Sequence, residues 1–232
     1  MKKIIIINDL HGNLTALQAV LPTIKSINPD YIFCPGDLIG IGPHSNEVID
    51  LIRTFPNCYC SKGNHECYLL DGFYNPASAF EVSHHQFIKK QVTKDNTAFL
   101  KTIPYEQHFV IEGFKICMLH YARDGLHYTP ITWNPTGEDL ETLYANIDAD
   151  IIIFGHEHKA SIISHKRLFI NSGSLGCSNH NPGYAKMVLL TLENKQYEIK
   201  EYLIPYDVNK VQQDITSINL PDGDFIKKTF IK

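Results

Sequence analysis

Long hydrophobic runs are missing from the sequence. A membrane-spanning helix needs about 20 consecutive apolar residues, and no apolar segment here approaches that length. The N-terminal apolar run at residues 4–7 ends at Asn8 and Asp9, before it reaches the roughly 7–15 residues of a signal-peptide core. We therefore expect a cytoplasmic protein that does not enter a membrane.

Paired cysteines of the Cys-x-x-Cys type are also missing, which excludes a zinc knuckle or a dithiol redox motif of that spacing. Most of the six cysteines lie inside apolar stretches, where reduced core thiols are expected. They are Cys34, Cys58, Cys60, Cys67, Cys117 and Cys177.

Basic charge is not in excess: the formal net charge is -4. Proteins that coat nucleic acid rely on a basic surface to displace counterions, so we expect no stable nucleic-acid complex. A content of 44% hydrophobic and 20% charged residues is ordinary for a globular protein. Because no repeat or low-complexity linker divides the chain, we expect one domain over residues 1–205, followed by a C-terminal tail over 206–232.

Short strands alternate with segments of helical period in the first third of the chain, which predicts βαβ units with a largely parallel sheet. Asn13 and Ser45 are placed to cap the two helices, and Pro22 is expected to kink the first or end it early. The predicted strands are residues 3–8, 31–34 and 58–61.

The rest of the chain reads differently. Residues 70–105 predict a helical, cap-like insertion over the site, and the following strands suggest a mostly antiparallel second half. The tail at 206–232 is expected to carry one short helix after or before a turn at 221–224. The predicted elements are strands at 107–111, 114–119 and 150–154, a helix at 138–146, a hairpin at 161–170, and long strands at 184–192 and 196–203.

Metal-ligating side chains follow strand after strand. One such residue is usually a turn or helix cap, but five groups that each follow an apolar strand are hard to explain by chance. In an open α/β sheet, loops at the carboxyl ends of neighbouring strands meet in one crevice. We therefore expect the following side chains to converge: Asp9, His11, Asp37, Asn64, His120, His156 and His158.

The spacing of these ligands predicts a two-metal centre. In an extended segment, the pairs Asp9-x-His11 and His156-x-His158 would each point to one side. Asp37 is the natural bridge, since one carboxylate can offer an oxygen to each ion. Oxygen and imidazole ligands without thiolate favour manganese, iron or zinc over a structural zinc site of the cysteine type.

These motifs resemble the calcineurin-like metallophosphoesterase superfamily, in the order D-x-H, G-D, G-N-H-E, H and G-H-x-H. The segments N-D-L-H-G-N-L at 8–14, G-D-L-I-G at 36–40 and N-S-G-S-L-G at 171–176 are similar to its small bacterial phosphodiesterase branch, which includes an asymmetric diadenosine tetraphosphate hydrolase. The resemblance implies an α/β sandwich of two mixed β-sheets flanked by helices, in α/β/β/α layers.

The resemblance also implies roles for individual residues. Asp9, His11 and His158 would hold one ion, and Asn64, His120 and His156 the second, with Asp37 between them. His65 would not be a ligand but would protonate the leaving oxygen, and a hydroxide bridging the two ions would attack phosphorus. Manganese is favoured, with iron, zinc, nickel and magnesium as alternatives.

One position departs from the family's pattern. Protein phosphatases of the superfamily carry an aspartate three residues after the bridging one, and here that residue is Gly40. This favours a phosphodiester or dinucleoside polyphosphate of the diadenosine tetraphosphate type, with a small phosphorylated or nucleotide substrate. A phosphoprotein phosphatase, a non-catalytic scaffold and a nuclease are the alternatives, and a homodimer is left open.

Rim residues have two interpretations each. Asn13 and Arg123 are the candidate substrate-binding residues, although Asn13 can act as a helix cap alone and Arg123 as an exposed loop residue. His84 and His85 are assigned to packing and solvent. The loop histidines His44, His127 and His180 are placed to border the crevice, although surface histidines are more often solvated.

Overall fold

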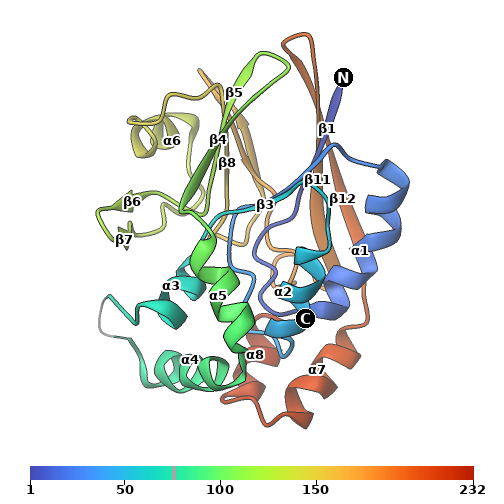
Figure 1. Ribbon diagram of the computed structural model, residues 1–232, viewed down its shortest axis with the longest axis vertical. Coiled ribbons are helices and arrows are strands. Elements are labelled where there is room, and N and C mark those ends of the chain that lie inside the picture. The colour runs from blue at the N-terminus through green and yellow to red at the C-terminus, as the bar shows by residue number, and fades with distance from the viewer. Residues whose placement is uncertain (75–76) are drawn as a thin grey trace.

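Two five-stranded sheets pack face to face, and helices cover their outer faces (Figure 1). The computed structural model describes residues 1–74 and 77–232. Residues 75 and 76, inside the predicted insertion, lie outside the described residues. The α/β/β/α arrangement confirms the expected fold class.

The first sheet has the order β12-β11-β1-β2-β3. Strands β1, β2 and β3 run parallel, as the βαβ pattern predicts, so their carboxyl ends lie at one edge. The hairpin of β11 and β12 joins β1 in antiparallel register. Their bounds are β1 Lys2–Ile6, β2 Tyr31–Cys34, β3 Cys58–Cys60, β11 Tyr184–Glu193 and β12 Gln196–Pro205.

The second sheet has the order β4-β5-β8-β10-β9. Its three central strands β5, β8 and β10 are parallel, and only the edge strands pair in antiparallel fashion. The prediction of a mostly antiparallel second half is therefore wrong for this sheet, because β8 is inserted between the two hairpins. The bounds are β4 Glu106–Ile111, β5 Phe114–Leu119, β8 Ile151–Phe154, β9 Ser161–Ser164 and β10 Leu168–Asn171; a separate hairpin joins β6 Arg123–Asp124 to β7 His127–Tyr128.

The side chains between the two sheets form a continuous apolar layer. Ile4 and Ile6 face Met118 and Ile153 of the second sheet, while the alternate residue Ile5 faces the helices. All of these side chains are buried. This packing holds the two sheets together and fixes the positions of the loops at their edges.

Six helices precede β8 in the described ranges. Helix α1 continues through Pro22 to Ile27, so the prediction of an early end is wrong. Pro22 is exposed, and Val20 and Ile24 keep the buried face on either side of it. The bounds are α1 Leu14–Ile27, α2 Ser45–Arg53, α3 Asn64–Leu70, α4 Ala79–Gln91, α5 Lys94–Thr102 and α6 Gly137–Leu143.

The C-terminal segment forms two helices, α7 Val208–Ser217 and α8 Gly223–Thr229, where one was expected. Val211 and Ile215 lie four residues apart and are buried on one face of α7. Ile226 of α8 joins the same core cluster. Across the described ranges, no helix combines the length and apolar character that a bilayer span requires.

Candidate metal centre and active site

The loops after β1 and β2 are tied together by backbone hydrogen bonds. The His11 N–H donates to the Asp37 carbonyl at 2.9 Å, and the Gly12 N–H donates to the Leu38 carbonyl at 2.8 Å. These bonds place Asp9, His11 and Asp37 side by side at the carboxyl edge of the first sheet. All three are buried, with 1% exposure or less.

Glu66 fixes the loop after β2. Its buried carboxylate accepts hydrogen bonds from the backbone N–H groups of Asp37, Leu38, Ile39 and Gly63. The residue stands in the third position of α3, so it links the start of that helix to the loop that carries Asp37. Glu66 ends the Gly-Asn-His-Glu motif at 63–66, and its contacts with the Asp37 loop become visible only in the fold.

Asp37 Oδ2 lies at the centre of the converging side chains. It is 3.7 Å from His11 Nε2 and 3.4 Å from His120 Nε2. Asp37 Oδ1 accepts a hydrogen bond from the His65 N–H at 2.9 Å, which sets the orientation of the carboxylate. One oxygen of Asp37 therefore faces both predicted groups of ligands.

Asn64, His120 and His156 form one of these groups. His120 Nε2 lies 3.0 Å from Asn64 Oδ1 and 3.2 Å from His156 Nδ1. On the other side of the ring, His120 Nδ1 lies 2.9 Å from the Pro35 carbonyl, which fixes Nδ1 as the donor. His120 therefore turns the lone pair of Nε2 inward, as metal-binding histidines do.

Asp9, His11 and His158 form the other group. His11 Nε2 and His158 Nε2 lie 2.8 Å apart, and each is within 4.0 Å of Asp9 Oδ1. The residues of this group do not lie in extended segments, so that prediction is wrong. Asp9, His11, His156 and His158 all have positive φ, because the chain turns sharply at the end of each strand.

The donor set fits divalent cations. Asp9 Oδ1 and Asp37 Oδ2 are buried and have no hydrogen-bond partner within residues 1–74 and 77–232. Burial raises the pKa of Asp9 to about 8 and that of Asp37 well above its usual range. Burial also lowers the pKa of His156 to about 4 and that of His158 to about 3. Positive ions would stabilise the ionised carboxylates and bind the neutral imidazoles.

His65 reaches the same space from the first turn of α3. Its Nε2 lies 4.0 Å from Asp37 Oδ2, and its side chain is 15% exposed. Distance alone groups His65 with His11 and Asp37 as a set that could hold an ion. Our assignment of His65 as an acid instead of a ligand is therefore a proposal.

Gly40 lies directly against the ring of His65. A Cβ added to Gly40 would fall 2.1 Å from His65 Nδ1, and the φ of Gly40 is +83°. No carboxylate can stand between the two residues. Behind His65, the ring of His85 lies 4.8 Å away between centroids. The interpretation of His84 and His85 as partly solvated is wrong: both are buried, and His84 Nε2 accepts a hydrogen bond from the Ile41 N–H.

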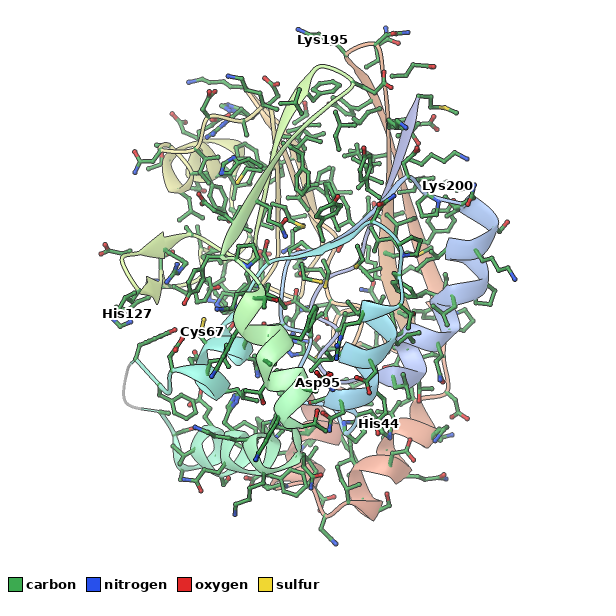
Figure 2. All side chains as sticks on the ribbon, viewed as in Figure 1. His44, Cys67, Asp95, His127, Lys195 and Lys200 are labelled. Carbon is green, nitrogen blue, oxygen red and sulfur yellow. The ribbon has the colours of Figure 1, made fainter. Side chains whose placement is uncertain are left out.

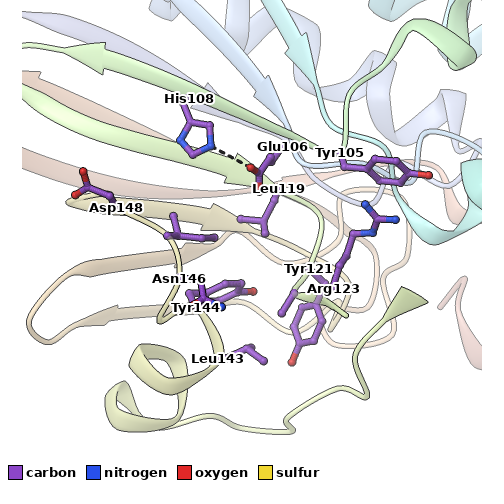
Figure 3. A pocket seen from close by; sticks show the side chains of 12 residues that line it. Tyr105, Glu106, His108, Leu119, Tyr121, Arg123, Leu143, Tyr144, Asn146 and Asp148 are labelled. Atoms are coloured by element: carbon purple, nitrogen blue, oxygen red, sulfur yellow. Dashed lines mark hydrogen bonds and ion pairs between the residues drawn. The ribbon is translucent and has the colours of Figure 1, made fainter. Parts of the chain in front are cut away.

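The two candidate substrate-binding residues differ in position. Asn13 is buried; its Oδ1 caps α1 by accepting from the Ala16 N–H, and its Nδ2 donates to the Gly176 carbonyl. Both polar ends thus have partners inside the protein, as the helix-cap interpretation expects. Arg123 lines a cavity of about 770 Å³ over β4 and β5, with its guanidinium 3.4 Å from the centre of the Tyr105 ring (Figure 3).

Sequence reasoning missed several residues that the fold brings to the site. The Gly-x-x-Glu spacing at 63–66 is a helix-start signal that could have indicated a capping role for Glu66. His85, Tyr68 and Tyr128 carry no local signal. Cys177 lies with His11 and His158, but burial raises the pKa of its thiol well above the usual range.

Residues 2–160 match the family model described as calcineurin-like phosphoesterase. The chain belongs to this family. Its members hydrolyse phosphoester bonds with divalent metal ions, and the converging donor groups above fit that chemistry. The predicted superfamily is therefore confirmed, and so is the interpretation of the protein as a phosphoester hydrolase.

One curated relative of this phosphoesterase matches nearly the whole chain, and a second matches about a quarter of it. An uncharacterized protein of Methanocaldococcus jannaschii is 29% identical, with 94% of each chain covered. A symmetrical bis(5'-nucleosyl)-tetraphosphatase of Erwinia tasmaniensis is 38% identical over 68 residues, which are 28% of this chain and 24% of that protein. The finer prediction of an asymmetric hydrolase branch is not decided by this partial match.

Solved structures share the fold of this phosphoesterase. A metallophosphoesterase from Sphaerobacter thermophilus has a TM-score of 0.76 at 19% identity and covers 98% of this chain and 99% of its own. A hypothetical protein from Pyrococcus horikoshii has a TM-score of 0.83 at 16% identity and covers 100% and 98%. Both matches run beyond the family model into the C-terminal helices.

Proposed function

We propose that this phosphoesterase hydrolyses phosphodiesters or dinucleoside polyphosphates with two divalent ions, of which manganese is the first choice. The observation that carries the proposal is the contact between Gly40 and His65. A carboxylate beside the histidine would stabilise its protonated form. Because Gly40 leaves no space for one, His65 is suited to leaving groups that need little protonation.

The residues have distinct roles in this proposal. Asp9, His11 and His158 hold one ion, Asn64, His120 and His156 hold the other, and Asp37 contributes to both. When bound, the ions supply an activated water nucleophile and neutralise charge on the phosphate. Asp37 also accepts the hydrogen bond from the His65 N–H, which fixes the proposed acid His65 relative to the proposed metal ligand Asp37.

His65 donates the proton to the leaving oxygen. Burial lowers its pKa well below the usual range, so the free ring is neutral at neutral pH. A phosphate anion in front of Nε2 favours the protonated form and raises this pKa. The acid is therefore charged mainly when substrate is bound, and a polyphosphate leaving group demands the least from it.

Charge on the substrate supports the same choice. A diester carries one negative charge near the ions, whereas a monoester carries up to two. A weakly protonated His65 compensates less of that charge. The non-catalytic alternative gains no support, because every one of the seven predicted ligand side chains is present at the site.

The test compares substrates that share a leaving group. We expect a higher kcat/KM for bis(p-nitrophenyl) phosphate than for p-nitrophenyl phosphate with manganese at neutral pH. Diadenosine tetraphosphate should also be cleaved, and chromatography of the products separates asymmetric from symmetric hydrolysis. A clear preference for the monoester would refute the proposal. A Gly40→Asp variant does not test it, because the new side chain would displace His65.

A further inference from the structure

An aromatic pocket of about 100 Å³ lies between α3, α4 and the β6–β7 hairpin. Figure 2 labels His127 on the β6–β7 hairpin and Cys67 on α3, which lies below the hairpin in this view. Most of the lining side chains are aromatic, and Glu81 of α4 adds a carboxylate. The lining residues are Tyr68, Phe73, Tyr74, Ala77, Glu81, His127 and Tyr128.

This pocket borders the metal centre on two sides. The Tyr68 ring lies 6.0 Å from the His65 ring between centroids. On the opposite wall, the Tyr128 ring lies 5.4 Å from His120 and 6.0 Å from His156. A phosphate at the centre of the ligand groups would therefore lie next to two of the rings that line the pocket.

The pocket walls are held in place by contacts within the protein. The Tyr128 hydroxyl donates to the Lys62 carbonyl, which fixes this ring on its hairpin. Tyr68 packs against Phe73 at 4.7 Å and against His85 at 5.2 Å between centroids. The pocket thus presents preformed aromatic faces that need little rearrangement to bind a flat ring.

We propose that this pocket binds the nucleobase of the nucleotide whose phosphate lies at the metal centre. The inference rests on the proposed function and narrows its substrate class to nucleotides. Aromatic side chains stack on any base, and a carboxylate oxygen accepts hydrogen bonds from the N–H groups at a base edge. A phenyl ring has no such groups. Oε2 of Glu81 accepts from Ser78 at the start of α4, so Oε1 is the oxygen that would face the base.

The size of the pocket limits what it accepts. Pockets for complete drug-sized ligands measure roughly 300–1,000 Å³, so a volume of about 100 Å³ accommodates one base and leaves the sugar and phosphates outside. The second nucleoside of a dinucleoside polyphosphate would lie elsewhere. This geometry predicts that one base, next to the cleaved phosphate, contributes to affinity through the pocket.

The test is calorimetric binding of AMP and of ribose 5-phosphate to the manganese-loaded protein. The two probes carry the same phosphate, so the ratio of their Kd values isolates the base. We expect AMP to bind about 5- to 150-fold more tightly, the range that stacking on one aromatic side chain supplies. Tyr68→Leu and Tyr128→Leu should each move the ratio toward one, whereas Tyr68→Phe should keep it.

Tyr184→Leu is the matched control, because this half-exposed tyrosine lies on β11, away from the pocket lining. It should leave the ratio unchanged. Equal Kd values in the wild type, or an unchanged ratio in both leucine variants, would overturn the proposal. Binding does not require turnover, so the proposed diesterase activity and the proposed nucleobase pocket can be refuted separately. If the protein binds AMP preferentially but cleaves no diester, the proposed activity is wrong and the proposed pocket stands.

Discussion

Five of the seven residues assigned as metal ligands have a positive φ, although none of them is glycine. The left-handed conformation costs such a residue roughly 1–2 kcal/mol. Hydrogen bonds between the loops hold this conformation in place, and bound cations would compensate for the buried carboxylates beside it. The strained residues are Asp9 (φ 48°), His11 (φ 47°), Asp37 (φ 53°), His156 (φ 76°) and His158 (φ 60°).

The position of Asp37 between both groups predicts the effect of removing it. In Asp37→Ala, we expect the metal content of the loaded protein to fall from two ions to less than one, measured by elemental analysis after desalting. Activity should be lost with it. Asp95→Ala is the control, because Asp95 is exposed on α5 and forms an ion pair with Arg53. Retention of two ions by Asp37→Ala would show that the ligand assignment is wrong.

The packing of His85 on His65 predicts coupled effects on turnover. His65→Ala should lower kcat by about 100- to 10,000-fold, the usual contribution of a general acid, with little change in metal content. His85→Leu removes the ring that lies 4.8 Å behind His65 and should cause a smaller loss.

The double variant distinguishes positioning from an independent role. If His85 acts only through His65, His65→Ala/His85→Leu should turn over at the rate of His65→Ala alone. Multiplied losses in the double variant would argue that His85 contributes separately. Metal content and the free energy of unfolding, measured for all three variants, identify losses caused by misfolding.

At the scale of elements, the strands and helices were largely predictable because each shows a clear apolar period. The backbone conformation of the ligand loops was not predictable. The spacing His156-x-His158 is compatible with extended and with left-handed backbone, and only the contacts between loops determine which conformation forms. The early end predicted at Pro22 does not occur, because packing of Val20 and Ile24 keeps α1 helical beyond it. The burial of His84 and His85 depends on how α4 packs against distant loops, which the local sequence does not encode.

Helix α4 also predicts a pH dependence of stability. Burial lowers the pKa of His84 to about 4, below the value near 6.5 of an unfolded histidine. As the pH falls from about 6.5 to 4, the unfolded chain binds a proton that folded His84 does not. The contribution of neutral His84 to the free energy of unfolding is therefore fully present above about pH 6.5 and is lost as the pH falls to about 4. Protonation of Nε2 would also break the hydrogen bond from Ile41.

His84→Gln removes this titration while an amide oxygen can still accept from the Ile41 N–H. We expect the free energy of unfolding in urea to fall less between pH 7 and pH 4.5 in His84→Gln than in the wild type. His108→Gln serves for comparison, since His108 is 54% exposed on β4 and should leave the pH dependence as it was. Parallel pH curves for wild type and His84→Gln would exclude His84 as the source.

At the scale of the whole molecule, the C-terminal helices complete the apolar core of the first sheet. Phe225 of α8 packs on Phe80 of α4 at 5.1 Å, and the Phe230 ring lies 6.2 Å from that of His158. The last residues of the chain therefore contact both the helix behind His65 and a proposed ligand. Pattern reasoning expected only an appended tail with one short helix, although Val208, Val211, Ile215 and Ile218 recur at helical spacing.

The burial of Ile226 predicts how much this segment stabilises the fold. Ile226→Ala should lower the free energy of unfolding by about 2–5 kcal/mol, because a fully buried side chain leaves a cavity when it is shortened. Urea titration measures this loss. Lys228→Ala on the exposed side of α8 should change stability by less than about 0.5 kcal/mol. A small effect of Ile226→Ala would mean that the segment packs loosely.

The uneven burial of the metal centre has a kinetic consequence. Asp9, Asp37 and His120 are fully buried, whereas the side chain of His158 is 14% exposed. The partly exposed side chains of His65, His156 and His158 therefore mark the side from which an ion would enter. We therefore expect passage between these rings to limit how fast the folded protein is loaded with metal.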